Sequence, residues 1–293
     1  MEQRSFKNDT QGELILIPTP IGNLEDMTFR AIRYLKEVDL IAAEDTRQTR
    51  KLCTHFEIQT PLVSYHEHNK MASGEKLVNQ MKEGLRVGLV TDAGTPGISD
   101  PGQDLVKRCV EEGIPVIPLP GACAATTALI ASGLPTDHFL FYGFLPRQKK
   151  ERQSVLHNLK EHPHTLIFYE APHRLRETLQ AMGDVFVDRE VTLARELTKK
   201  YETFVRGSYS ALMDWATENE PRGECCLIVE GQKTPTESDQ PAFWSTLSPI
   251  EHVDYYQEQG LDKKEAIKKA AADRGLSKRE VYNAYHQESD SSY

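Results

Sequence analysis

The sequence predicts an α/β protein with two α/β domains and a small helical C-terminal extension. Three observations lead to this class. In the first half of the chain, short apolar runs alternate with helix-like segments, which is typical of a mostly parallel sheet with helices on both faces. No apolar run approaches the roughly 20 residues that a membrane-spanning helix needs. A polar stretch, QKTPTESDQ at 232–240, separates the last expected strand from a charged tail.

The composition fits a globular protein with a sizeable core, since 39% of the 293 residues are hydrophobic and 27% are charged. The five cysteines have no CxxC spacing, so neither a zinc site nor a disulfide framework is expected, and no metal is predicted. A net charge of −9 argues against wrapping long nucleic acid but permits a local basic patch. Residues 1–12 are polar and lack a secretory pattern, so we expect a disordered tail and a cytoplasmic protein.

The N-terminal domain is expected at residues 13–146. Its apolar runs predict strands at 13–20, 39–45, 61–67, 86–92, 114–120 and 138–144. The helix-like segments between them lie at 26–38, 46–56, 69–84, 100–113 and 121–133. In the fourth of these helices, Asp100 stands at the expected N-cap, Pro101 in the first turn and Gly113 at the C-cap.

The C-terminal α/β domain is expected at residues 147–231. Strands are predicted at 164–172, 190–197, 200–207 and 224–231. Only a few residues separate the second and third of these strands, which favours antiparallel pairing. After the linker at 232–240, the extension at 241–293 contains two helix-like segments around the turn RGLS, a pattern that resembles a helix-turn-helix.

Three loops rich in Gly, Pro, Ser, Thr and Ala follow expected strands of the first domain. They are PTPIGN at 18–23, DAGTPGISDPG at 92–102 and PLPGACAAT at 118–126. In a parallel sheet all three lie at the carboxyl edge, where open α/β folds bind ligands. The alternative is that they are tight strand-to-helix turns, although three such loops at one edge favour a ligand site.

The loops have neither the Gly-Lys-Ser/Thr of a phosphate-binding loop nor a GxGxxG fingerprint, and they contain no lysine. A polyphosphate or dinucleotide is therefore disfavoured. A compact ligand with adenine, ribose, carboxylate and ammonium groups fits better. Main-chain groups and the side chains of Asp92, Thr95 and Ser99 would bind this ligand.

The three loops, followed by IFYEAPHR at 167–174, resemble the tetrapyrrole methylase superfamily over roughly residues 13–231. AEDTR at 43–47 and the form GTPGISDPG are similar to the branch that 2′-O-methylates a cytidine in the decoding centre of small-subunit ribosomal RNA. The resemblance implies the class III methyltransferase fold, S-adenosylmethionine as methyl donor and a homodimer. It also implies small-subunit ribosomal RNA or the assembled 30S subunit as partner, and no membrane.

The resemblance also implies roles for individual residues. Pro20 would close the crevice, Ala93, Gly94 and Thr95 would hold the methionine end or ribose, and Ile98 would lie against the cofactor. The remaining cofactor contacts would come from Gly121, Cys123, Ala124, Glu170 and Leu197, around the adenosine. Typical family members have Gly-Gly-Asp-Pro where this chain has Ala93-Gly94-Thr95-Pro96, which leaves Asp92 as a possible substitute carboxylate.

Methyl transfer to a ribose hydroxyl needs alignment of the reacting atoms and a route for the hydroxyl proton. Glu44 and Asp45 follow the second expected strand at the ligand edge and are candidate catalytic residues. The alternative is that Asp45 or Thr46 caps the next helix.

RNA contact requires cations for the phosphates and flat or apolar groups for the base. The candidate RNA-binding residues are Arg47, Arg147, Lys149, Lys150, His173 and Arg174. Residues 261–286 carry seven Lys and Arg against four Asp and Glu, so the extension either adds RNA affinity or is a helical packing appendage. A methyltransferase acting on a small molecule such as a tetrapyrrole, and a non-catalytic RNA-binding protein, are the rival functions.

Overall fold

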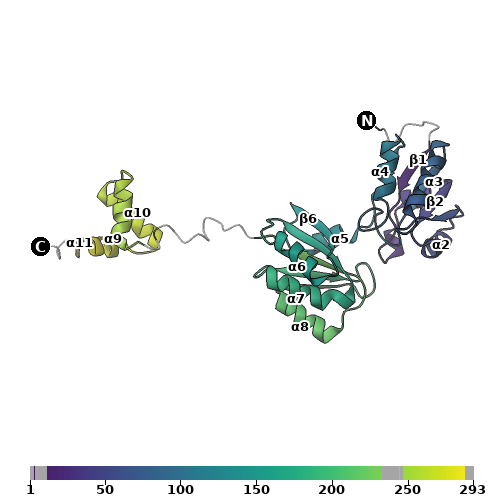
Figure 1. The fold of residues 1–293 in the computed structure, drawn as a ribbon. Coiled ribbons are helices and arrows are strands. Elements are labelled where there is room, and N and C mark those ends of the chain that lie inside the picture. The colour runs from purple at the N-terminus through teal and green to yellow at the C-terminus, as the bar shows by residue number, and fades with distance from the viewer. Residues whose placement is uncertain (1–2, 4–11, 233–243, 245–246, 288–293) are drawn as a thin grey trace. The chain divides into compact units, whose positions relative to one another are not determined.

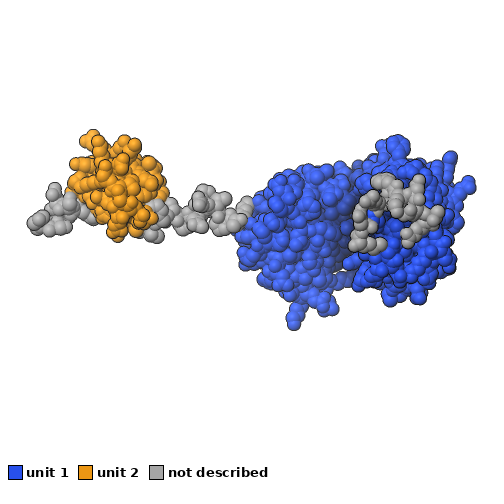
Figure 2. Space-filling model, turned by 90° about the horizontal axis from the view of Figure 1, so that it is seen from above, with its two compact units in different colours: residues 1–232 blue, residues 233–293 orange. Residues whose placement is uncertain are grey.

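The computed structural model describes residues 3, 12–232, 244 and 247–287. The chain divides into two compact units, residues 1–232 and residues 233–293, which Figure 2 shows in blue and orange. Within the described residues, the first unit contains two five-stranded sheets and the second contains helices. None of the described helices is long and apolar enough to cross a membrane.

The first sheet is entirely parallel, with the strand order β3-β2-β4-β1-β5. Its strands are β1 (Glu13–Leu16), β2 (Leu40–Ala43), β3 (Leu62–Ser64), β4 (Arg86–Val90) and β5 (Val116–Pro118). All five strands therefore end at one edge, as the sequence predicts, and the loops that follow them meet there.

Helices cover both faces of this sheet, because alternate residues of each strand point to opposite sides. Ile15 and Ile41 pack with α1 (Phe29–Glu37) and α2 (Thr46–His55) on one face. Leu14 and Leu40 pack with α3 (Lys70–Lys82) and α4 (Gln103–Glu111) on the other. A short 3-10 turn, η1 (Leu24–Asp26), precedes α1.

The second sheet is mixed, with the strand order β6-β7-β10-β8-β9. Its strands are β6 (Phe139–Phe144), β7 (Thr165–Glu170), β8 (Val191–Arg195), β9 (Thr203–Gly207) and β10 (Cys225–Val229). β6 and β7 are parallel and the other neighbours are antiparallel, including β8 and β9, whose antiparallel pairing the short connection predicts.

The two faces of the second sheet are also covered. Three helices, α6 (Lys149–Asn158), α7 (Leu175–Val185) and α8 (Tyr209–Asn219), pack side by side on one face (Figure 1). On the other face α5 (Ala124–Ser132) packs through Ala125, Ala128 and Leu129 against Ile167 and Cys226. A 3-10 turn, η2 (Pro172–Arg174), leads from β7 into α7.

The expected domain limits need one correction. The strand expected at 138–144 falls by sequence in the N-terminal domain, which is expected to end at residue 146, but the observed strand β6 pairs with β7 in the second sheet. α5 also packs on the second sheet. The change from one sheet to the other therefore falls between β5 and α5. Apolar patterning shows that a segment is a strand, but it does not show which sheet that strand joins.

The start of α4 also differs from the prediction. Asp100 does not cap this helix, because α4 begins at Gln103 with Gly102 as N-cap, and no side chain accepts a capping hydrogen bond. Gly102 has φ 149° and Ser99 has φ 61°, so the chain turns through a conformation that favours glycine just before the helix. Because of this turn Asp100 lies outside the helix and its carboxylate does not cap it.

The second unit is a small helical body with its own core. It comprises α9 (Pro249–Glu258), α10 (Lys263–Arg274) and α11 (Lys278–Gln287). Val253, Ile267 and Val281, one from each helix, are buried together. Gly275, with φ 63°, is the C-cap of α10, so the two helices predicted around the turn RGLS are present. The expected linker lies outside the described residues except for Gln232, and the expected tail does so except for Gln3 and Gly12.

Candidate functional site

The three loops at the carboxyl edge of the first sheet form one connected cluster. Thr19 and Gly94 exchange two backbone hydrogen bonds, of 2.9 and 3.0 Å, so the first loop pairs with the second. The Thr95 hydroxyl donates to the Ala122 carbonyl oxygen at 3.0 Å and joins the second loop to the third. Gly94 has φ 82°, which allows the main chain to turn at this junction. The cluster is therefore more than three independent turns.

In the second sheet, the ends of β7 and β8 and the start of β10 face this cluster. Register brings the ends of β7 and β8 level with the start of β10, because Cys225 pairs with both Glu170 and Arg195. Ile21 of the first loop packs with Leu197, which follows β8, in one apolar cluster with Ala194 and Cys226. Residues from both halves of the first unit thus enclose a common space.

That space is a cavity of about 420 Å³. This volume is within the range of about 300–1,000 Å³ that small-molecule sites occupy. Backbone and small side chains of the glycine-rich loops form one wall, and Tyr169, Ala194, Leu197 and Cys226 contribute to the other. Apolar side chains beside polar main-chain groups are typical of small-molecule sites.

The cavity gathers the predicted cofactor residues except Pro20 and Gly121. Those that line it are Asp92, Ala93, Gly94, Thr95, Ile98, Ser99, Cys123, Ala124, Glu170 and Leu197. Pro20 lines a separate hollow of about 330 Å³ beside α2. Gly121 lies against Pro18, since a Cβ atom at Gly121 would come within 2.5 Å of the Pro18 Cβ, so its contribution is close packing of two loops.

The cavity is strongly acidic. Glu44, Asp92, Asp100, Glu196 and Glu224 line it, and the cationic side chain among the lining residues is Lys199. Lys199 lies 3.0 Å from a Glu196 carboxylate oxygen and 3.8 Å from one of Glu224. This excess of negative charge favours a positively charged ligand and disfavours phosphate.

Three of these carboxyl groups have raised pKa values. Burial is the main cause at Glu44 and Asp92, and the negative charge of Asp92 at the first and of Asp45 at the second raises the pKa further. At Asp100, burial followed by the charges of Glu44, Asp92 and Glu224 raises the pKa to about 7. Carboxyl groups with such pKa values in a cavity are typical of functional sites.

Asp45, the second predicted catalytic residue, does not line the cavity. Its carboxylate caps α2 by accepting from the Arg47 backbone N–H at 2.8 Å. It also accepts from Arg47 Nε and Nη2 at 3.0 and 2.7 Å, and these bonds lower the pKa of Asp45 to about 2. The structure therefore supports the capping alternative for Asp45, and its exposed partner Arg47 is held beside it.

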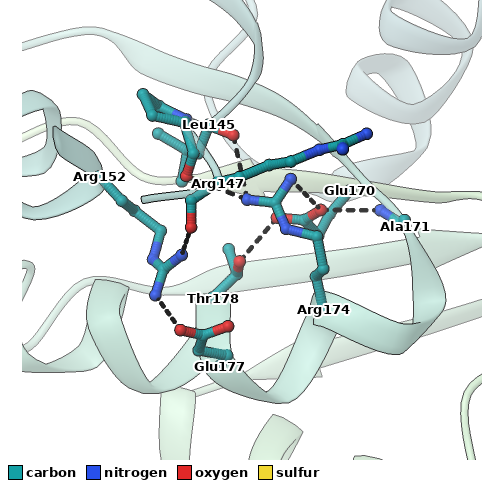
Figure 3. A network of polar contacts seen from close by, with 9 residues as sticks. Leu145, Arg147, Arg152, Glu170, Ala171, Arg174, Glu177 and Thr178 are labelled. Atoms are coloured by element: carbon teal, nitrogen blue, oxygen red, sulfur yellow. Dashed lines mark hydrogen bonds and ion pairs between the residues drawn. The ribbon is translucent and has the colours of Figure 1, made fainter. Parts of the chain in front are cut away.

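Glu170 contributes to the cavity wall, but its carboxylate is engaged in a buried network (Figure 3). It accepts from the Thr178 hydroxyl at 2.6 Å and from the Ala171 backbone at 2.8 Å. Arg174 lies 3.5 Å from the same carboxylate and donates to the carbonyl oxygens of Leu145 and Pro146, both at 3.1 Å. Arg174, predicted to bind RNA, is therefore occupied in joining β6 to β7 and α7.

The other predicted RNA-binding cations lie at the surface. We call Arg147, Lys149 and Lys150 the junction cations, because they stand between β6 and the first turn of α6. All three are exposed, as is His173 in η2. Figure 3 shows the Arg147 side chain extending away from Arg152 and Glu177, while its carbonyl oxygen accepts from Arg152 at 3.3 Å. These cations are available to an anionic partner.

Sequence reasoning missed several residues of the cavity. They are Ile21, Asp100, Phe144, Tyr169, Ala171, Pro172, Ala194, Glu196, Lys199, Glu224, Cys225 and Cys226. Most come from the edge of the second sheet, which apolar patterning cannot place opposite the first. The stretch EAP is a usable signal for Ala171 and Pro172, because Glu170 ends β7 and the proline two residues later begins the turn η2.

Comparison with known proteins agrees with this geometry. Residues 13–212 match the family described as Tetrapyrrole (Corrin/Porphyrin) Methylases. A protein of Bacillus subtilis named ribosomal RNA small subunit methyltransferase I is 58% identical over 97% of this chain and 98% of its own length. Proteins of the same name from Halalkalibacterium halodurans and Synechocystis are 56% and 47% identical, over 98% and 92% of this chain and 99% and 96% of theirs.

Solved structures show the same fold at low sequence identity. Uroporphyrin-III C-methyltransferase from Thermus thermophilus, complexed with S-adenyl homocysteine, has a TM-score of 0.54 and 19% identity. The match covers 75% of this chain and 97% of that one. Cobalt precorrin-4 methyltransferase has a TM-score of 0.55 and 16% identity, with 74% and 94% covered. A parallel and a mixed sheet around a loop-lined cavity, the family match and the near-full-length relatives lead to one conclusion: the chain belongs to the tetrapyrrole methylase family.

Proposed function

We propose that this protein is an S-adenosylmethionine-dependent methyltransferase that methylates the ribose 2′-hydroxyl of a cytidine in the decoding centre of small-subunit ribosomal RNA. The observation that carries the proposal is the acidic, loop-lined cavity in a chain with near-full-length relatives, one of them 58% identical, that are named for ribosomal RNA methylation. A ribosomal substrate also implies a cytoplasmic protein.

The cavity fits the methyl donor. When bound, S-adenosylmethionine supplies a methyl group on a positively charged sulfonium, which the carboxylates of Asp92 and Glu44 suit by charge. Ala93 and Gly94 present main chain without bulky side chains to the ribose and methionine end. Leu197 and Ala194 provide an apolar surface of the kind that an adenine ring requires.

The residues also fit an RNA acceptor better than a small acidic molecule. The interior repels phosphate, so only a base and its ribose would enter, while the phosphates stay outside. The junction cations and His173 are exposed and available for those phosphates. A uroporphyrin-type acceptor carries several carboxylates, which the acidic cavity disfavours.

Two further parts of the molecule belong to the proposal. β6 forms one edge of the second sheet and leaves Phe139 and Tyr142 exposed, and Ile130 of α5 is exposed as well. Exposed apolar side chains at a sheet edge favour contact with a second copy, so we propose a homodimer. In the second unit the lysines of α10 are exposed and add affinity for ribosomal RNA.

The test is a pair of measurements on the full chain. Calorimetric titration with S-adenosylmethionine should show one binding site per chain, and absence of binding would leave only an RNA-binding protein with this fold. Purified protein should then transfer labelled methyl to small ribosomal subunits from cells that lack the gene, and not to uroporphyrinogen. Transfer to uroporphyrinogen alone would establish the small-molecule alternative.

A further inference from the structure

The hollow beside α2 shares a wall with the acidic cavity. Its volume of about 330 Å³ is at the lower end of the range for small-molecule sites. Pro20 and Gly22 of the first glycine-rich loop line the hollow, whereas Ile21 between them lines the acidic cavity. Asp92 lines both spaces. The two spaces are therefore neighbours at the same edge of the first sheet, and one extended ligand can reach both.

One face of α2 lines the hollow. Gln48, Lys51 and His55 are three and four residues apart, which places them on the same side of the helix. All three side chains are exposed. α2 begins at Thr46, three residues after β2 ends at Ala43, so its first turns lie close to the carboxyl edge of the sheet. The hollow is therefore accessible from solvent beside the proposed site of methyl transfer.

The hollow differs from the acidic cavity in its charge. Apart from His55, the charged side chains among its lining residues are Lys51 and Asp92. Lys51 Nζ donates to the neutral Gln48 side chain at 3.1 Å, and it forms no ion pair with any residue in the described part of the chain. Its positive charge is therefore available to an anion. Of the two spaces, the hollow is the one that suits a phosphate group.

Flat and apolar groups line the same hollow. Leu24 of η1 is 43% exposed although its side chain is large and apolar, and Leu52 of α2 lies at the hollow as well. The His55 ring contacts the Phe56 ring edge-on, with 4.7 Å between the centroids. Imidazole rings and apolar side chains are surfaces on which the bases of single-stranded RNA stack. The hollow thus offers a place for one base beside a lysine that suits its phosphate.

A buried hydroxyl group at the hollow lacks a partner. Thr91 follows β4 directly and is 1% exposed, and its hydroxyl makes no hydrogen bond with any residue that the structure describes. The neighbouring Thr19 hydroxyl donates to the Thr91 carbonyl oxygen at 3.1 Å instead. Buried polar groups without a partner are rare in folded proteins, and a bound polar molecule is one explanation for them. Thr91 therefore supports a polar ligand in this hollow.

We propose that the hollow beside α2 binds the nucleotide next to the methylated one in the ribosomal RNA strand, with its base against Leu24 and His55 and its phosphate at Lys51. This inference rests on the proposed function. The ribose that receives the methyl group lies in the acidic cavity, and the strand passes over the first glycine-rich loop into the hollow. Consecutive nucleotides are joined by a phosphate, so a cation directly beside the methyl-transfer site holds the strand in register.

The experiment measures steady-state methylation of small ribosomal subunits, taken from cells that lack the gene, by the full chain and its variants. Lys51→Ala should raise the KM for subunits about tenfold at about 0.1 M salt and lower the slope of log affinity against log salt concentration by about one. Lys36, an exposed lysine in the last turn of α1, lines neither space and provides the matched control. Lys36→Ala should behave as the parent.

The contact with the base is tested at His55. Loss of one stacked base corresponds to a rise in KM of about 5–150-fold for His55→Ala. His55→Phe should recover most of that loss, because a phenyl ring keeps the flat surface without the ring nitrogens. The Kd for S-adenosylmethionine, measured by calorimetry, should stay within about twofold of the parent for every variant, since neither Lys51 nor His55 lines the acidic cavity.

The results separate this inference from the proposed function. A parent that neither binds S-adenosylmethionine nor methylates ribosomal subunits would refute the proposed function itself. A parent that does both, while Lys51→Ala and His55→Ala stay within twofold of its KM, would overturn the inference. A changed donor Kd in these variants would also overturn it, because the hollow would then belong to the donor site.

Two further readings keep the test decisive. Lys51 and His55 are exposed, so their variants should melt within about 2 °C of the parent, and a change in KM then reports on the substrate and not on folding. Failure of His55→Phe to recover the loss would refute the stacking of a base on this ring.

Discussion

Replacement of Asp100 by Asn is expected to stabilise the protein at alkaline pH, because the folded state holds this carboxyl among other acidic groups. The pKa of this carboxyl is about 7 in the folded protein, against 3.8 for an unperturbed Asp. The folded state therefore holds a proton that the unfolded chain has lost, and the parent becomes less stable as the pH rises from about 4 to 7. Above that range the folded state must hold a carboxylate among Glu44, Asp92 and Glu224.

The size of the effect follows from the pKa difference. A difference of about 3 corresponds to about 4 kcal/mol at 1.36 kcal/mol for each unit of pKa. Asp100 is only partly buried, so water screens part of this energy and we expect a gain of about 2 kcal/mol at pH 8.5. For a unit of this size, that gain raises the melting temperature by about 4–8 °C.

The assay is thermal unfolding of the parent, Asp100→Asn and Asp104→Asn at pH 8.5 and pH 5, followed by circular dichroism. The gain for Asp100→Asn should shrink by more than half at pH 5, where the folded parent is protonated. Asp104→Asn should show a small loss instead, since its carboxylate pairs with Lys70 at 2.6 Å. No gain at pH 8.5, or an equal gain at both pH values, would refute the electrostatic reasoning.

Three other outcomes are expected. Ala124→Phe should fill the cavity and weaken S-adenosylmethionine binding by at least about 100-fold in calorimetry, while Ala124→Ser should leave it nearly unchanged. Changing the three junction cations to Ala should raise the KM for ribosomal subunits. It should also lower the slope of log affinity against log salt concentration by about one for each phosphate that the variant no longer binds. The Kd for the methyl donor should stay unchanged, and an altered donor Kd would count against a purely RNA-binding role. Arg174→Ala should cost about 3 kcal/mol in urea unfolding because it leaves the buried Glu170 carboxylate without its cation, and adding Glu170→Gln should recover part of that loss.

Much of the first sheet could be predicted from the sequence. Apolar runs such as ELIL and LIAA bury both faces, so they indicate parallel strands, and the glycine-rich loops after them mark the carboxyl edge. That edge does hold the loop cluster, and most of the predicted cofactor residues line the cavity. Local patterns sufficed here because the residues concerned follow their strands directly.

The remainder depends on contacts between distant segments. Asp100 stands in an Asp-Pro-Gly sequence that is typical of a helix start, and only the turns at Ser99 and Gly102 free it from that role. The local sequence around Arg174 is typical of a free surface cation, but the fold places its guanidinium 3.5 Å from the Glu170 carboxylate. The local pattern assigns Phe144 to the first domain, but β6, which contains it, pairs with β7 in the second sheet. In each case a long-range contact decides between two locally reasonable structures.

The most direct test of the central claim is methyl transfer by the purified chain to small ribosomal subunits from cells that lack its gene, read by nuclease digestion and mass spectrometry. The account predicts that one 2′-O-methylated cytidine appears in the decoding centre when S-adenosylmethionine is supplied, and that the Ala124→Phe variant produces none. Methyl groups on a base, methyl groups on another molecule, or no gain at all would contradict it.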